Sequence, residues 1–307
     1  MIKYKCNKCE KEFNQKSKYD SHMKRKTSCK KKLKYIDLFC GMGSFHYSFQ
    51  KFGFECVMAS DICEPAKKTY QENFKIQPLD DICLIDPKTI KPYDILCAGF
   101  PCQPFSQCGK QMGFDDERGT MFFQVMKFVK ENIPKIVILE NVKGLLKHDN
   151  GNTFNTMKLK LEEEGYDVIH KILVCSDYGI PQMRNRLFII GFKNINVKEI
   201  DKFFDLTQYE KSTTLSKYLG KKFEKDTAYT LRCGGKNSPI NDRHNWDGYW
   251  VDKKEYRLTI SDGLKLQGFS NYTMKGKTNE QWKMLGNTIP TVFTEIIGKQ
   301  IIKHCKF

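Results

Sequence analysis

The 307-residue sequence has no apolar run approaching the roughly 18 to 20 residues that span a bilayer. Its first residues, MIKYKCNKCE, also lack the apolar stretch of a signal peptide. We therefore expect no membrane segment and a protein that stays inside the cell, in the cytoplasm or in a nucleus. No internal repeat of about 20 to 50 residues is present, which argues against a solenoid. Arginine is scarce, with seven residues among the 52 basic ones.

Positive charge is the main excess. The 52 Lys and Arg residues outnumber the 36 Asp and Glu residues, which gives a formal net charge of +16. Such a charge favours a polyanionic partner, either nucleic acid or an acidic membrane surface. Without a membrane segment, nucleic acid is the better interpretation. The 13 cysteines, an odd number without an export signal, indicate reduced thiols and not a disulfide framework.

The composition changes abruptly near residue 34. Residues 1–33 are rich in Lys, Cys and Asn, whereas short apolar runs such as YIDLF, YDILCAGF and KIVILENV then alternate with amphipathic stretches. This alternation predicts an α/β fold with a parallel sheet and helices on both faces. The periodicity dissolves between residues 193 and 255, which predicts a loop-rich insert. We expect four segments: 1–33, 34–191, 192–270, and 271–307, which returns to the first sheet.

The first segment contains a candidate metal site. Cysteine and histidine recur in the order Cys6, Cys9, His22 and Cys29. Four such ligands suit a tetrahedral Zn²⁺ ion, and a segment this short has no core without the metal. The pattern resembles a classical ββα zinc finger with cysteine as its last ligand. Lysines along the presumed helix indicate contacts with DNA phosphates. A protein-binding finger and a basic tail with incidental cysteines are the alternatives.

A glycine-containing turn follows the apolar run 35–39. Gly41 and Gly43 stand where a strand passes into a helix, so the backbone can approach a ligand at the carboxyl edge of the sheet. Asp61 follows about 20 residues later, at the end of the next expected strand, where a carboxylate can accept ribose hydroxyls. A dinucleotide would favour a third glycine where His46 stands. A nucleoside cofactor without a pyrophosphate therefore fits better.

Two reactive side chains follow later expected strands. Cys102 comes after Pro101 at the end of YDILCAGF, and a rigidly held thiolate at a strand end is a good nucleophile. Glu140 closes the apolar run KIVIL, where an acidic residue is awkward unless the site requires it. A buried structural cysteine and a carboxylate satisfied by a helix N-terminus are the alternatives.

The motifs DLFCGMGSF, GFPCQPFS, ENV, QMRNR and GNTIP, in this order, resemble those of the DNA (cytosine-5) methyltransferases. The resemblance runs from about residue 34 to the end, apart from the insert. It implies a Rossmann-like sheet that binds S-adenosylmethionine, and a cytosine flipped out of double-stranded DNA. It also implies that Cys102 adds to carbon 6 of the base, that Glu140 holds a proton at N3, and that Arg184 and Arg186 form the site wall.

The same resemblance assigns the other site residues. Around the cofactor it places Phe39, Gly41, Met42, Gly43, Asp61, Ile62, Asp81, Ile82, Pro101 and Asn287. For DNA it implies Ser106, Lys110 and Arg118 in a mobile catalytic loop, and Arg232, Arg243 and Arg257 in or beside the insert, which resembles a target recognition domain. Arginine suits bidentate contacts with base edges.

Two other functions remain open. A transfer RNA cytosine methyltransferase has the same fold, but that branch carries Cys-Phe-Thr in the recognition region, which is absent here. A DNA-binding regulator with an inactive enzyme domain would need neither Cys102 nor Glu140. We therefore expect a monomeric methyltransferase that acts on a short double-stranded DNA sequence, with a cognate restriction endonuclease as a candidate partner.

Overall fold

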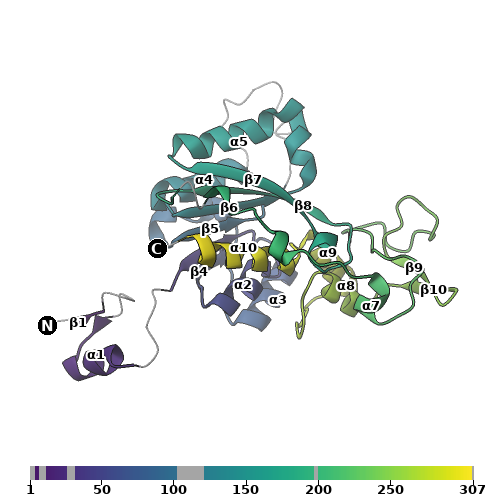
Figure 1. The fold of residues 1–307 in the computed structure, drawn as a ribbon, viewed down its shortest axis with the longest axis horizontal. Coiled ribbons are helices and arrows are strands. Elements are labelled where there is room, and N and C mark those ends of the chain that lie inside the picture. The colour runs from purple at the N-terminus through teal and green to yellow at the C-terminus, as the bar shows by residue number, and fades with distance from the viewer. Residues whose placement is uncertain (1–3, 7–11, 26–31, 102–120, 197–199, 306–307) are drawn as a thin grey trace.

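The computed structural model describes residues 4–6, 12–25, 32–101, 121–196 and 200–305. A six-stranded sheet forms its centre, with helices on both faces (Figure 1). Neighbouring strands β4, β3, β5 and β6 are parallel, whereas β8 runs antiparallel to both β6 and β7. In spatial order the strands are β4 (Glu55–Ser60), β3 (Lys34–Leu38), β5 (Ile95–Ala98), β6 (Ile136–Asn141), β8 (Asn185–Phe192) and β7 (Asp167–Val174).

Strand β8 departs from the parallel sheet that the sequence predicts. Only residues 175–184 connect β7 to β8. A parallel connection needs a crossover of roughly a dozen residues or more, usually a helix, so this short segment returns the chain antiparallel. The α/β class and a mostly parallel central sheet are confirmed.

Alternate strand residues pack against two layers of helices. In β3, Tyr35 packs on the face covered by α2 and α10, whereas Ile36 and Leu38 pack on the face covered by α4 and α5. The helices of these layers are α2 (Ser44–Phe49), α10 (Thr291–His304), α4 (Met121–Asn132) and α5 (Asn152–Glu163), and α3 (Glu64–Phe74) follows β4. None of the helices in the described ranges is long and apolar enough to cross a bilayer.

Short 3-10 helices link several of these elements. They are η1 (Gln50–Phe52), η2 (Ile82–Leu84), η3 (Pro87–Thr89), η4 (Lys143–Gly151), η5 (Cys175–Asp177) and η6 (Thr207–Tyr209). Asp81 accepts a hydrogen bond from the Cys83 amide at 2.9 Å and so caps η2. The residues before η2 return to the end of β4, where Leu79 forms an isolated bridge with Ser60.

Residues 215–287 form a second lobe, and its apolar core also includes Met42 and Ala66 from the first part of the chain. Trp246 is only 1% exposed; its ring meets that of Trp282 edge-on at 5.2 Å, and its Nε1 donates to the Gly234 carbonyl. The core thus holds the irregular loops together. The elements of this lobe are α7 (Leu215–Leu219), the antiparallel pair β9 (Gly248–Val251) and β10 (Lys254–Arg257), α8 (Ile260–Leu266) and α9 (Thr278–Asn287).

The N-terminal segment has a ββα arrangement. Strand β1 (Tyr4–Lys5) pairs antiparallel with β2 (Glu12–Phe13), and α1 (Lys16–Met23) follows. Cys6 and His22 are buried, and the Phe13 ring lies 4.9 Å from that of His22. Cys9 and Cys29 lie outside the described residues. Within the described ranges, no group of three or more His, Cys, Asp or Glu side chains is arranged to hold a metal.

Candidate active site

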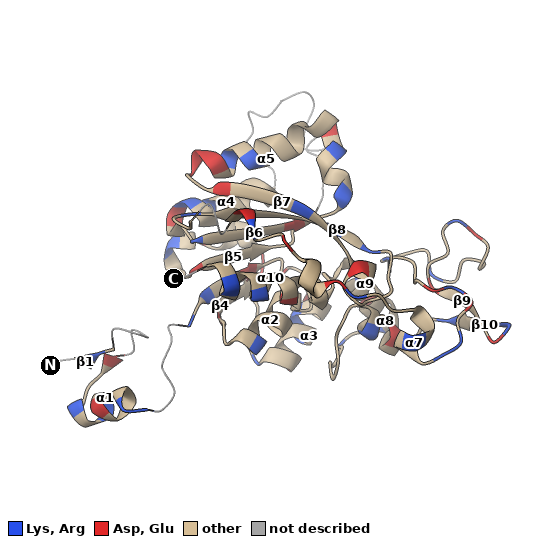
Figure 2. Cartoon of the chain, viewed as in Figure 1, with Lys and Arg blue, Asp and Glu red and all other residues tan. Residues whose placement is uncertain are grey.

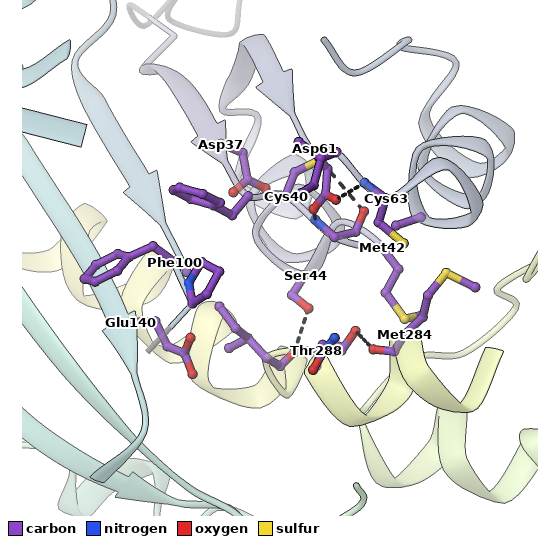
Figure 3. A pocket seen from close by; sticks show the side chains of 18 of the residues that line it. Asp37, Cys40, Met42, Ser44, Asp61, Cys63, Phe100, Glu140, Met284 and Thr288 are labelled. Atoms are coloured by element: carbon purple, nitrogen blue, oxygen red, sulfur yellow. Dashed lines mark hydrogen bonds between the residues drawn. The ribbon is translucent and has the colours of Figure 1, made fainter. Parts of the chain in front are cut away.

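The carboxyl ends of β3, β4, β5 and β6 meet at a cavity of about 600 Å³. Ligands of parallel α/β sheets bind at this edge because the loops that follow the strands converge there. Figure 3 shows Glu140 and Phe100 on one side of the cavity and Asp61 and Met42 on the other. The predicted cofactor residues that line it are Phe39, Gly41, Met42, Asp61, Ile62, Asp81, Ile82, Pro101 and Asn287.

The turn after β3 has an unusual backbone. Phe39 and Gly41 adopt left-handed conformations, with φ of 60° and 53°. A non-glycine residue held there costs on the order of 1–3 kcal/mol, and such residues gather at ligand sites. Gly43, with φ of 86°, does not line the cavity. A Cβ atom on it would clash with the Phe74 ring, so this glycine allows the turn to pack against α3.

Asp61, which follows β4, stabilises this turn through hydrogen bonds. Its Oδ2 accepts a hydrogen bond from the Gly41 amide and its Oδ1 accepts one from the Cys63 amide, both at 2.8 Å. Burial raises the pKa of Asp61, while these two amide hydrogen bonds oppose the shift. The carboxylate that the sequence assigns to ribose therefore also fixes the backbone of the cofactor turn.

The end of the chain closes the other side of the cavity. The Ser44 hydroxyl donates to the Ile289 carbonyl at 2.6 Å, and the Thr294 hydroxyl donates to the Ser44 carbonyl at 3.1 Å. Asn287 lines the cavity, and its Oδ1 accepts a hydrogen bond from the Cys233 thiol at 2.8 Å. The first and last sequence motifs thus form one wall.

Glu140, the second-last residue of β6, is a buried carboxyl that faces Arg186 from the adjacent strand β8. The Arg186 Nε lies 2.8 Å from the Glu140 Oε1, and both side chains line the cavity. Burial raises the pKa of Glu140, whereas the charges of Arg186 and Arg184 oppose the rise. Gly99 gives the carboxyl room, since a Cβ there would lie 3.3 Å from the Glu140 Oε2. The pair suits a group that exchanges a proton with a ligand.

Arg184 occupies a different place from the site wall that the sequence predicts. Its guanidinium is fully buried and does not line the cavity. It donates to the carbonyls of Leu231 at 3.1 Å, Gly286 at 2.9 Å and Thr288 at 2.7 Å. Burial, reinforced by the charge of Arg186, lowers the pKa of Arg184 to about 9. This arginine joins the loop at Leu231 to the end of α9 and to Thr288, which follows it, and Gly286 and Thr288 line the cavity.

The predicted nucleophile Cys102 lies outside the described residues, as do the predicted loop residues Ser106, Lys110 and Arg118. The described residues on either side of this segment, Pro101 and Met121, both line the cavity.

The arginines predicted to contact DNA from the second lobe differ in their surroundings. Arg232 and Arg243 are exposed. Arg257 forms an ion pair with Glu255 and another, at 3.3 Å, with the fully buried Asp247, so it holds the lobe together. Figure 2 shows basic residues around β10 and α7, and exposed lysines there are Lys217, Lys221, Lys222, Lys225, Lys253 and Lys254.

Sequence analysis did not single out Asp37, which also lines the cavity. Its side chain is buried in β3 among apolar neighbours, with 1% of the residue exposed. The signal was an acidic residue inside the run YIDLF, the same signal that identified Glu140.

These features define an α/β enzyme that binds a nucleoside cofactor at the carboxyl edge of its sheet. The family of C-5 cytosine-specific DNA methylases matches residues 33–249, and the chain belongs to this family. It is a DNA (cytosine-5) methyltransferase, and S-adenosylmethionine is the cofactor expected of the family.

Curated relatives match nearly the whole chain. The type II methyltransferase M.HhaI of Haemophilus parahaemolyticus is 34% identical over 313 residues, covering 90% of this chain and 96% of the relative. M.HpaII of Haemophilus parainfluenzae is 41% identical over 323 residues, covering 89% and 90%. The crystal structure of Schizosaccharomyces pombe Dnmt2 superposes with a TM-score of 0.66 at 19% identity, covering 89% of this chain and 99% of that one. At that identity the likeness shows the fold alone.

Proposed function

We propose that this enzyme methylates carbon 5 of a flipped-out cytosine within a specific short sequence of double-stranded DNA. The observation that carries the proposal is the single cavity lined both by the predicted cofactor residues and by the Glu140–Arg186 pair. Its volume of about 600 Å³ lies in the usual range for small-molecule sites. The left-handed turn and Asp61 suit a nucleoside, and S-adenosylmethionine, when bound there, supplies an electrophilic methyl group.

The residues then divide the chemistry between them. Carbon 5 of cytosine is too weak a nucleophile to accept a methyl group unaided. The Cys102 thiolate adds to carbon 6 while Glu140 holds a proton at N3, and the ring becomes an enamine with a nucleophilic carbon 5. After methylation, loss of the carbon 5 proton and expulsion of the thiolate restore the aromatic ring. Arg186 orients Glu140, and Arg184 positions the surrounding backbone.

The second lobe is our candidate for target recognition. Arg232 and Arg243, which are exposed, are proposed to contact base edges or phosphates, whereas Arg257 supports the lobe. Ser106, Lys110 and Arg118 are proposed to contact the duplex around the flipped base. We retain the division into 1–33, 34–191, 192–270 and 271–307 as part of this proposal.

We further propose that Cys6, Cys9, His22 and Cys29 bind one structural Zn²⁺ ion that stabilises the ββα segment. The burial of Cys6 and His22, with the His22 ring beside that of Phe13, supports this. Metal analysis of purified protein should find about one zinc per chain, and a Cys9→Ser, Cys29→Ser double variant should bind none. An equal zinc content in both proteins would contradict the site.

Type II methyltransferases among the relatives favour a cognate restriction endonuclease as the biological partner. We propose a monomer, because one base is flipped in each event. These bacterial relatives give no support to a nuclear location.

Transfer of a radiolabelled methyl group from S-adenosylmethionine tests the function. Double-stranded DNA and total transfer RNA are incubated in parallel, and the labelled nucleosides are separated. We expect label in 5-methylcytosine of DNA, and label in RNA alone would replace the DNA assignment.

The Cys102→Ser variant tests the nucleophile. We expect it to lose turnover while it binds cofactor and DNA like the wild type. Near-normal methyl transfer by this variant would refute the role of Cys102.

A further inference from the structure

Lys67 of α3 is a buried lysine next to the cofactor cavity, and the methyl-transfer chemistry gives it no role. Only 7% of the residue is exposed. Lysine is almost never fully buried unless its charge is paired. The Lys67 Nζ forms ion pairs with Glu64, at 2.9 Å, and with Asp80. Because Asp80 lines the cavity, the second ion pair connects α3 to the cavity wall.

The segment around Asp80 forms part of that wall. Asp80 and the predicted cofactor residue Asp81 are consecutive, and both line the cavity. One residue earlier, the Leu79 carbonyl accepts a hydrogen bond from the Asp61 amide at 2.9 Å. The segment therefore lies beside the carboxylate that the sequence assigns to ribose. The ion pair with Lys67 adds an attachment from α3 to the one that Leu79 makes.

The charge of Lys67 also acts on Asp61, the carboxylate that stabilises the cofactor turn. Burial raises the pKa of Asp61, and the charge of Lys67 acts with two backbone amides against this rise. An ionised carboxylate accepts such amide hydrogen bonds more strongly than a neutral carboxyl does. Lys67 therefore supports two acidic positions of the cavity, Asp80 by direct contact and Asp61 through its charge.

We propose that Lys67 is a positioning residue of the cofactor site, which holds the Asp80–Asp81 segment where it receives the adenosine part of S-adenosylmethionine. The inference rests on the proposed function, since it concerns the binding of that same cofactor. Lys67 itself does not line the cavity. It acts through Asp80, and its loss should therefore weaken cofactor binding without changing the reacting groups.

Replacement of Lys67 by methionine removes the charge and keeps an unbranched side chain. Lys67→Met should bind S-adenosylhomocysteine and 5′-methylthioadenosine at least about threefold more weakly than the wild type, because both ligands carry the adenosine part. The KM for S-adenosylmethionine should rise as well, whereas kcat at saturating cofactor should stay within about twofold. Equilibrium binding to the full-length protein without DNA gives the two dissociation constants.

The neighbouring lysine provides a matched control. Lys68 lies on the same helix with 64% of its side chain exposed, and its Nζ is 3.8 Å from Glu64. Lys68→Met removes the same charge from α3 and should bind both ligands within about twofold of the wild type.

Asp80→Asn breaks the same ion pair from its exposed end, where 76% of the side chain is exposed. It should weaken binding of both ligands at least about threefold. Residues that act through one contact show non-additive effects, so the Lys67→Met, Asp80→Asn double variant should bind no more weakly than the weaker single variant. If Lys67→Met does not fold, Asp80→Asn alone tests the ion pair.

Four results would overturn the proposal. They are weakening of less than about threefold in Lys67→Met, equal weakening in Lys68→Met, single effects that multiply in the double variant, and a lower kcat with unchanged KM. If the wild type binds neither ligand, the proposed function itself fails.

Discussion

Replacement of Glu140 by glutamine tests whether this residue exchanges a proton with the target cytosine. The side chain keeps its size and can still accept a hydrogen bond from Arg186, which lies 2.8 Å from the carboxyl in the wild type. It cannot exchange a proton with N3 of cytosine. We therefore expect cofactor binding to persist within about twofold, while methyl transfer slows.

The magnitude follows from the role of the proton. A positioned general acid or base contributes about 10²- to 10⁴-fold to a rate, which is about 3–5 kcal/mol of barrier. Burial raises the pKa of Glu140, so its protonated form extends to higher pH than for an exposed glutamate. The proposed role needs that protonated form. Wild-type kcat should therefore fall as the pH rises through this pKa, and Glu140→Gln should not show that fall.

Single-turnover transfer of labelled methyl to double-stranded DNA, across a range of pH, measures both effects. Glu163→Gln is the matched control, because this carboxylate lies on α5 with 59% of its side chain exposed and pairs only with Lys160 among described residues. The control should behave as wild type. A Glu140→Gln rate within about threefold of wild type, with the pH dependence unchanged, would refute the reasoning.

Three other changes test the supports of the cavity. Gly43→Ala should lower the free energy of unfolding by about 2 kcal/mol or more, because its Cβ would meet the Phe74 ring; a loss below about 0.5 kcal/mol in urea would contradict this. Arg184→Lys cannot span three carbonyls and should cost about 2–4 kcal/mol; an unchanged urea midpoint would show that these contacts matter little. The Asp37 carboxyl stays protonated in the folded protein, whereas in the unfolded chain it loses its proton near pH 4. The free energy of unfolding of the wild type should therefore decrease as the pH rises from about 4 to the raised pKa of Asp37. Asp37→Asn should lack this decrease, and identical dependence of stability on pH in both proteins would contradict the raised pKa.

Many residues of the cavity could be predicted because the end of a buried strand is visible in sequence as the end of an apolar run. Gly41, Asp61 and Glu140 each follow or end an apolar run, and parallel strands bring such positions to one edge. Glu140 and Arg186 meet because β6 and β8 are neighbours.

Other features depend on contacts that side-chain identity does not reveal. Arg184 binds main-chain carbonyls, and every residue has one, so no sequence pattern marks its partners. The direction of β8 depends on the length of a connection and not on composition. Trp246, which stands among the candidate recognition loops, fills the core of its lobe because its ring meets Trp282 there.

The hydrogen bond from Arg184 to the Leu231 carbonyl has a consequence for how the DNA sequence specificity of such an enzyme changes over evolution. The contact is made to a carbonyl oxygen, so it is indifferent to the side chains that follow in the second lobe. Exposed side chains such as those of Arg232 and Arg243 can be exchanged while Arg184 still joins the Leu231 carbonyl to those of Gly286 and Thr288 beside the cavity. Under the proposed role of the second lobe in target recognition, new target sequences can therefore be acquired by replacing loops, with the Glu140–Arg186 pair left as it is.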